Sequence, residues 1–220
     1  MTIRIDIERR TLQLTTHLAV IATMSSARPN LQRQFLKEAA PYLTAYTPLA
    51  PEVIHPNILK WMITRASEQV VYRPLEELHH FYFTYTNGYW LLPGYPRLLY
   101  NRPQKKALCA STSAIGAIGE GVSALLAQRL YQGTRRLARP LHDFPDLVTT
   151  DTKTTFMVEA KATTGSVSQI KQVIEDELFR MAQHVGACTP LDIRPVVGLL
   201  IGTALLEETR YHSVITEVRL

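Results

Sequence analysis

The tripeptide Phe144-Pro145-Asp146 is followed, thirteen positions after the aspartate, by Glu159-Ala160-Lys161. The aspartate and the second tripeptide fall in two short runs of strand-like composition, at residues 145–150 and 155–162. Because side chains alternate across a strand, Glu159 and Lys161 share one face of the second run. A carboxylate and an ammonium group are therefore predicted to lie side by side on one strand.

The segment between the two predicted strands, residues 149–154, is polar and turn-prone. A two-residue turn at 151–152 places Asp146 diagonal to Glu159. A four-residue turn at 151–154 places it directly opposite, and in either case the Cβ atoms are roughly 5–8 Å apart. An odd-numbered loop puts Asp146 on the other face, because a one-residue shift of register moves every side chain of a strand to the opposite face of the sheet. The spacing thus allows a shared site without requiring one.

These side chains suit a divalent-metal site. Mg²⁺ prefers oxygen ligands and keeps several waters, so one or two carboxylates and a substrate phosphate suffice. Bound metal polarises a phosphate and lowers the pKa of water, and a neighbouring lysine can stabilise the charge that develops. The alternative is structural: Asp146 closes a turn, while Glu159 and Lys161 form a solvated strand face.

Residues 113–131 are predicted to form a helix, because their apolar side chains recur at helical spacing. The apolar stripe consists of Ile115, Ile118, Val122, Leu125, Leu126 and Leu130. A second row, which contains Glu120, is made mostly of alanines and lets the helix approach another element closely. A buried carboxylate is costly unless it is paired or metal-bound, so Glu120 is a candidate ligand. The alternative is a surface glutamate among exposed alanines.

Downstream of the motif, Ser166 and Ser168 offer N-caps for a helix that runs to about Val185. Its apolar stripe is Ile170, Ile174, Leu178, Met181 and Val185, and its charged residues Lys171, Glu175, Asp176, Glu177 and Arg180 are expected mostly on the solvent side. Residues 195–202 form a continuous apolar run typical of a strand buried on both faces. With a first strand expected within residues 135–142, the predicted order is helix, three strands, helix, strand.

Over residues 113–202, the motif and this order resemble the PD-(D/E)xK signature and common core of the restriction-endonuclease-like nucleases. The resemblance implies that Asp146, Glu159 and Glu120 hold the metal and that Lys161 is the catalytic lysine. It also implies Mg²⁺ as cofactor, with Mn²⁺ substituting, and DNA as the substrate of an endonuclease. Restriction, defence, mobile-element processing and repair are roles that suit such an activity.

RecB-type and related nucleases place a glutamine and, four positions later, a tyrosine on the helix after the lysine. Here the fourth positions after Gln169 and Gln172 are Val173 and Asp176, so that subfamily is disfavoured. Gln169, at the helix start, is kept as a candidate nucleic-acid contact, and a solvent-facing glutamine is the alternative.

The composition is that of an ordinary globular protein, with 46% hydrophobic and 20% charged residues. No apolar run approaches the ~18 residues of a membrane span, and the N-terminus lacks the apolar core of a signal peptide. The two cysteines, Cys109 and Cys188, form neither a disulfide framework nor a recognisable metal spacing. We therefore expect a cytoplasmic protein that does not enter a membrane.

Basic charge is concentrated in the first half of the chain. Residues 1–110 contain thirteen Lys and Arg against seven Asp and Glu, whereas residues 111–220 contain eleven against twelve. A basic surplus is the electrostatic signature of a nucleic-acid partner, and Arg97, Arg102, Lys105 and Lys106 are the candidate contacts. Neighbouring aromatic residues could stack on unpaired bases, or could instead form core or a homodimer interface.

We therefore predict an α/β protein in which residues 111–220 form a restriction-endonuclease-like core, a mixed central sheet flanked by helices. Residues 1–110 are predicted to be a mainly helical, basic and aromatic region for DNA binding or dimerisation, with an aromatic hairpin turning at Asn87-Gly88. Two other readings are open. One is a catalytically silent nuclease-like module that binds nucleic acid or a protein partner, and the other is an unrelated basic structural protein that binds no metal.

Overall fold

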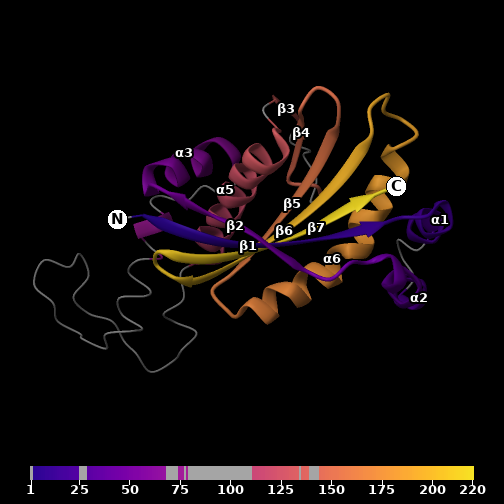
Figure 1. Ribbon diagram of the computed structural model, residues 1–220, viewed down its shortest axis with the longest axis horizontal. Coiled ribbons are helices and arrows are strands. Elements are labelled where there is room, and N and C mark those ends of the chain that lie inside the picture. Colours follow the sequence, from indigo (N-terminus) through magenta and orange to yellow (C-terminus); the bar gives the residue numbers. More distant parts are fainter. Residues whose placement is uncertain are drawn as a thin grey trace, which may run out of the picture.

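A computed structural model describes residues 2–24, 29–67, 74–76, 78, 111–133, 135–138 and 144–220 of the 220-residue chain. Its centre is a seven-stranded sheet with helices on both faces (Figure 1). The strands are β1 (Ile3–Gln13), β2 (Thr47–Ile54), β3 (Arg135–Ala138), β4 (Leu147–Thr150), β5 (Thr155–Thr163), β6 (Val196–Glu207) and β7 (Arg210–Arg219). The helices are α1 (Thr16–Met24), α2 (Pro29–Ala39), the 3₁₀ turn η1 (Ala40–Tyr42), α3 (Pro56–Ala66), α5 (Thr112–Tyr131) and α6 (Val167–Cys188).

The sheet is mixed, with strand order β2-β1-β7-β6-β5-β4-β3. Strands β1 and β7 pair in parallel, as do β5 and β6, and the other neighbours are antiparallel. The predicted order of helix, three strands, helix and strand is confirmed as α5, β3, β4, β5, α6 and β6. The predicted mixed sheet flanked by helices is confirmed as well.

Residues 1–110 contribute two strands to the central sheet, although the sheet was expected within residues 111–220. This region, expected to be mainly helical, contains α1, α2 and α3, but it also supplies β1 and β2, so the expected division at residue 110 does not separate the strands of the sheet. In β1 the alternating Ile3, Ile5 and Ile7 are all buried, as the two-residue period of a strand requires. Strand β1 is interior to the sheet, because it pairs with β2 on one side and with β7 on the other.

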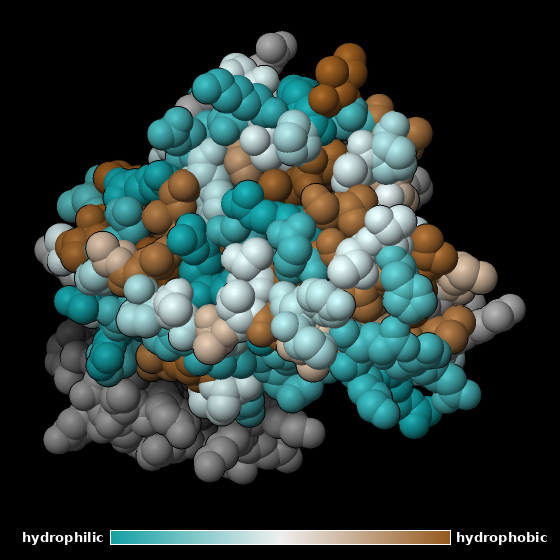
Figure 2. Space-filling view, turned by 45° about the vertical axis from the view of Figure 1, so that its right-hand side comes forward, coloured by the Kyte–Doolittle hydropathy of each residue, from teal (hydrophilic) through white to brown (hydrophobic). Residues whose placement is uncertain are grey.

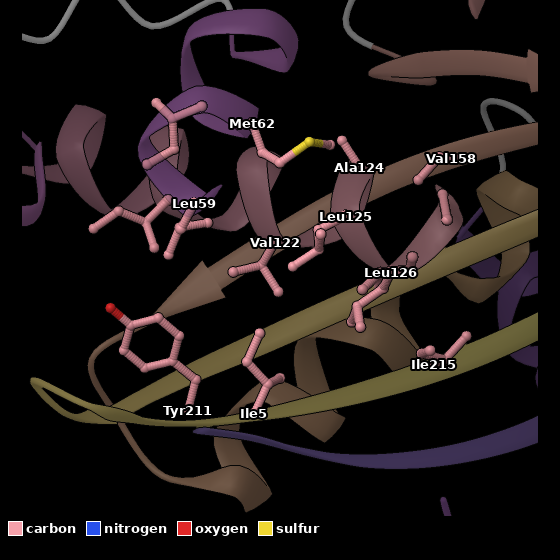
Figure 3. Close-up of a cluster of buried hydrophobic side chains, with 14 of the residues drawn as sticks. Ile5, Leu59, Met62, Val122, Ala124, Leu125, Leu126, Val158, Tyr211 and Ile215 are labelled. Atoms are coloured by element: carbon pink, nitrogen blue, oxygen red, sulfur yellow. The ribbon is translucent and has the colours of Figure 1, made fainter. Parts of the chain in front are cut away.

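Two apolar cores lie on opposite faces of the sheet. On one face, α3 and α5 pack against strand residues that include Ile5, Val158 and Ile215 (Figure 3). On the other face, α1, α2 and α6 pack against residues that include Met157, Leu200 and Val214. Neighbouring residues of β5 therefore point into different cores, which assigns Glu159 and Lys161 to the face that α6 covers.

Helix α6 lies close above β6 because two glycines of that strand have no side chain beneath it. A Cβ added at Gly198 would lie 2.5 Å from Met181 Cγ, and one added at Gly202 would lie 2.7 Å from Ile170 Cγ1 and Ile174 Cγ1. The predicted apolar stripe of α6 is buried as expected. The helix is thus centred on β6, with one flank toward β5 and the other toward β7 and β1.

Several predictions fall on residues that the structure does not describe: the hairpin at Asn87-Gly88, the basic residues Arg97, Arg102, Lys105 and Lys106, and residues 139–142 of the expected first strand. Among the described helices, none combines the length and the apolar character needed to cross a bilayer. Hydrophilic and hydrophobic residues are interspersed on the face drawn in Figure 2.

Candidate functional site

The hairpin of β4 and β5 sets the register of the predicted motif. Its strands pair from Thr150 with Thr155 to Leu147 with Val158, which leaves a four-residue loop at 151–154. The Asp151 carboxylate stabilises this loop by accepting the backbone N–H groups of Lys153, at 2.9 Å, and Thr154, at 2.7 Å. Of the two even-numbered turns allowed by the sequence, the four-residue turn is the one that forms.

Asp146 and Glu159 face each other one residue beyond the last strand pair, and each carboxylate is held by the backbone of the other strand. Asp146 Oδ2 accepts the backbone N–H of Ala160 at 2.7 Å. Glu159 Oε2 accepts the backbone N–H of Asp146 at 3.2 Å. The predicted apposition of the two carboxylates is therefore confirmed, and the backbone fixes both of them.

Lys161 joins this pair from the same strand. Its Nζ atom donates to Glu159 Oε1 at 2.6 Å and lies 3.7 Å from Oε1 of Glu177, a residue of α6. Oε2 of Glu177 is in turn 4.0 Å from Nη1 of Arg180. We call Asp146, Glu159, Lys161, Glu177 and Arg180 the Glu159 cluster. It joins β4, β5 and one flank of α6.

Burial and like charge act on the central carboxyl of this cluster. Glu159 is 1% exposed, and its burial, followed by the neighbouring charge of Asp146, raises its pKa to about 7 although the hydrogen bond from Lys161 opposes the shift. Burial disfavours the charged form of Lys161, but the hydrogen bond and charge of Glu159 outweigh it, so the pKa of Lys161 is raised. Lys161 therefore stays protonated at neutral pH, whereas Glu159 has a pKa close to neutral pH.

Glu120 lies on α5, the helix that packs against the opposite face of β5. The close approach predicted from its row of small residues is observed, since a Cβ added at Gly119 would lie 2.6 Å from Ala162 Cβ. Glu120 itself is half-buried. Within the described part of the chain, no three His, Cys, Asp or Glu side chains are grouped as metal ligands would be. The structure thus brings Asp146, Glu159 and Lys161 together, and Glu120 does not complete a three-ligand set with them.

Gln169 forms part of the helix cap at the start of α6. Its side-chain oxygen accepts the backbone N–H of Ser166 at 2.8 Å, and its own N–H donates to Ser166 Oγ at 3.3 Å. This reciprocal pair is a capping box. A contact of Gln169 with nucleic acid stays a prediction, and its side-chain oxygen already has a structural role.

The donor set of the Glu159 cluster fits Mg²⁺. This ion binds proteins through one or two carboxylates and keeps its remaining ligands as water or substrate phosphate, so Asp146 and Glu159 suffice in number and chemistry. Burial and, after it, the charge of Asp146 raise the pKa of Glu159, and a cation bound between the two carboxylates would relieve their repulsion. These two residues are therefore the ones that could hold the ion.

Two members of the cluster were not expected from sequence. Glu177 and Arg180 were assigned to the solvent side of α6, but Glu177 contacts Lys161, and the Arg180 guanidinium lies 4.7 Å above the ring of the buried Phe144. Glu177 flanks the apolar stripe, three positions after Ile174 and four before Met181. Such a boundary position is the signal that could have identified it, because it lies at the edge of the buried face.

A second group of charges lies along the other flank of α6. Arg10 and Lys171 lie over the Tyr46 ring, and each contacts a carboxylate. With these partners and His212, which lies beside Glu8, they form the Arg10 cluster: Glu8, Arg10, Lys171, Glu175 and His212. Arg10 pairs with Glu175 at 2.5 Å, Lys171 pairs with Glu8 at 2.5 Å, and Arg10 also donates to Thr216 Oγ1 at 2.9 Å. This cluster joins β1, β7 and α6.

Comparison with known proteins gives no match to a family model, to a curated protein or to a solved structure. The fold and the two clusters are therefore the basis for a functional proposal.

Proposed function

We propose that this protein is a Mg²⁺-dependent nuclease with a restriction-endonuclease-like core that cleaves DNA phosphodiester bonds in the cytoplasm, with Mn²⁺ able to replace Mg²⁺. The observation that carries the proposal is the apposition of Asp146 and Glu159 across β4 and β5, with Lys161 bonded to Glu159. The element order α5, β3, β4, β5, α6, β6 supports it further, because it is the order expected of such a core.

Each residue has a distinct role in this proposal. Asp146 and Glu159 bind the ion, and the backbone bonds from Ala160 and Asp146 keep the two carboxylates oriented toward each other. The bound ion supplies a Lewis acid that polarises the phosphate and lowers the pKa of water. Lys161 contributes a fixed positive charge beside the phosphate, where negative charge develops in the transition state.

A cleavage assay on plasmid and single-stranded DNA tests the proposal, with Mg²⁺, Mn²⁺ or chelator present. We expect cleavage with either ion and none with chelator. Asp146→Asn should abolish cleavage while leaving the fold intact. Asp176→Asn is the matched control, because Asp176 is exposed on α6 and bonds to Gln172 at 3.0 Å. Cleavage by Asp146→Asn at the wild-type rate would overturn the proposal.

The same assay separates the proposal from a catalytically silent module. Such a module would bind DNA by gel shift yet cleave neither substrate with either ion. An unrelated structural protein would neither bind DNA nor respond to Mg²⁺ or Mn²⁺ in a thermal-shift measurement.

A further inference from the structure

Lys161 has two acidic neighbours that come from different elements. Glu159 precedes it by two residues on β5 and contacts it at 2.6 Å, whereas Glu177 approaches from α6 and lies at 3.7 Å. The shorter contact makes Glu159 the main partner of Lys161 in the structure described here. Glu177 is a second acceptor already within ion-pair distance.

The proposed function creates a conflict for the shorter contact. Glu159 is there a ligand of a divalent cation, and its Oε1 atom is the one that accepts Lys161 Nζ. Two cations that share one carboxylate in a buried site repel each other strongly, because the surroundings screen them poorly. Lys161 must then either leave the site or find another anion.

Glu177 is held in a position to be that anion. Its Oε2 atom is 4.0 Å from Arg180, and the Arg180 guanidinium is stacked 4.7 Å from the ring of Phe144, two positions before Asp146. The Phe144 ring is buried and also stacks against His184, with the ring centres 4.6 Å apart. Glu177 therefore lies between two cations, and the one on its far side rests on a fixed aromatic ring.

We propose that Glu177 is a positioning residue that keeps Lys161 in the site when Glu159 binds a divalent cation, an inference that rests on the proposed function. Lys161 exchanges its main partner from Glu159 to Glu177 and remains beside the phosphate. The exchange needs no movement of the backbone, since both acceptors already lie near Nζ. Without Glu177, Lys161 stays on Glu159 and competes with the cation.

Mn²⁺ affinity, measured by calorimetry on the full chain without DNA, tests this exchange by a double-mutant cycle. The variants are Glu177→Gln, Lys161→Ala and the double variant, with Asp176→Asn as the control for removing one negative charge from α6. Glu177→Gln should raise the Kd for Mn²⁺ about 10-fold, the loss typical of a residue that orients a metal ligand. Lys161→Ala should lower it, and in that background Glu177→Gln should change it less than about 2-fold, because no lysine is left to compete.

The outcomes separate this inference from the proposed function. If Glu177→Gln raises the Kd by the same factor with and without Lys161, Glu177 acts through its own charge and the exchange is overturned, while the nuclease proposal stands. If wild-type protein binds no Mn²⁺, or binds it equally after Glu159→Gln, the proposed metal site is overturned and this inference with it. A loss of kcat in Glu177→Gln with an unchanged KM for DNA supports the positioning role.

Discussion

The two charged clusters on the flanks of α6 are built from similar side chains but differ in their balance of charge. In the Arg10 cluster, the carboxylates of Glu8 and Glu175 are matched by Lys171 and Arg10. In the Glu159 cluster, three carboxylates lie with two cations: Glu159 bonds to Lys161, Asp146 faces Glu159, and Glu177 lies between Lys161 and Arg180. One helix thus separates a neutral group of charges from an acidic one.

The difference shows which cluster serves the fold. Opposite charges that pair one to one satisfy each other, and the Arg10 side chain, 6% exposed, also bonds to Thr216 and lies 4.3 Å from the Tyr46 ring centre. Two carboxylates that face each other do the reverse, because each charge disfavours the other. The Arg10 cluster is therefore expected to stabilise the protein, and the Glu159 cluster to reduce its stability until a cation binds.

The largest expected effect is a difference in cleavage rate between lysine variants of the two clusters. Lys161→Ala should lower the cleavage rate about 100- to 1,000-fold, the usual cost of removing a group that stabilises transition-state charge. Lys171→Ala, the same substitution in the Arg10 cluster, should leave the rate nearly unchanged. Single-turnover cleavage with Mg²⁺ measures both, and equal rates in the two variants would remove the functional distinction between the clusters.

The next effect concerns the stability of the protein in chelator as pH rises. Glu159 has a pKa of about 7 in the folded protein against 4.5 for the ordinary group, so between these values the folded state binds more protons than the unfolded state. Stability therefore falls as pH rises from 5 to 8. At about 1.4 kcal/mol per pKa unit, the loss approaches about 3 kcal/mol at pH 8. The free energy of unfolding, measured with urea at pH 5 and pH 8, should fall in the wild-type protein and not in Glu159→Gln. An equal fall in both proteins would contradict this prediction.

A smaller effect is expected where the charges are balanced. Arg10→Ala leaves Glu175 without its main partner, and removing one member of a buried pair typically costs about 3–5 kcal/mol. Glu175 keeps 35% of its side chain exposed to water, so we expect a loss of about 2 kcal/mol in the free energy of unfolding. Urea unfolding measures it, with Arg180→Ala as the control in the other cluster. A greater loss in the control would reverse the assignment of structural roles.

The smallest effect tests the aromatic centre of the Arg10 cluster. Tyr46→Phe removes only the hydroxyl that lies 3.2 Å from Thr216 Oγ1 and keeps the ring beneath Arg10 and Lys171. We expect a loss of at most about 1 kcal/mol, the usual net value of one hydrogen bond. Thermal unfolding by circular dichroism is sufficient to detect it. A loss as large as that of Arg10→Ala would show that the hydroxyl, rather than the charges, holds the cluster together.

Sequence reasoning predicted the Glu159 cluster in part because its core residues are close in the chain. Alternation along one strand placed Glu159 and Lys161 together, and the polar loop limited Asp146 to a few registers. The choice of the four-residue turn depended on bonds to Asp151 that no periodicity reveals. Glu177 was not predicted as a member of the cluster, because its contact with Lys161 depends on how α6 is rotated over β6. The close contact of α6 with Gly198 and Gly202 sets this rotation.

The Arg10 cluster could not be assembled from sequence at all, since its members are brought together by β1, β7 and α6. The strand β1 itself was predictable, because Ile3, Ile5 and Ile7 alternate with charged residues. The pairing of β1 with β7 was not predictable, because pairing between strands that are distant in sequence leaves no local pattern. Strand β2 was hidden by Pro48 and Pro51, which are tolerated there because β2 is at the edge of the sheet.

The pairing of β1 with β7 has a consequence for how the protein is made. Arg10 and Thr216 lie on adjacent strands although they are 206 positions apart in the chain. At ribosomal speeds of roughly 5–20 residues per second, the interval between their synthesis is on the order of 10–40 s. Throughout it β1 is without its parallel partner β7, and an unpaired strand edge can pair with other chains. We therefore expect the nascent protein to be most prone to such pairing before β7 has emerged.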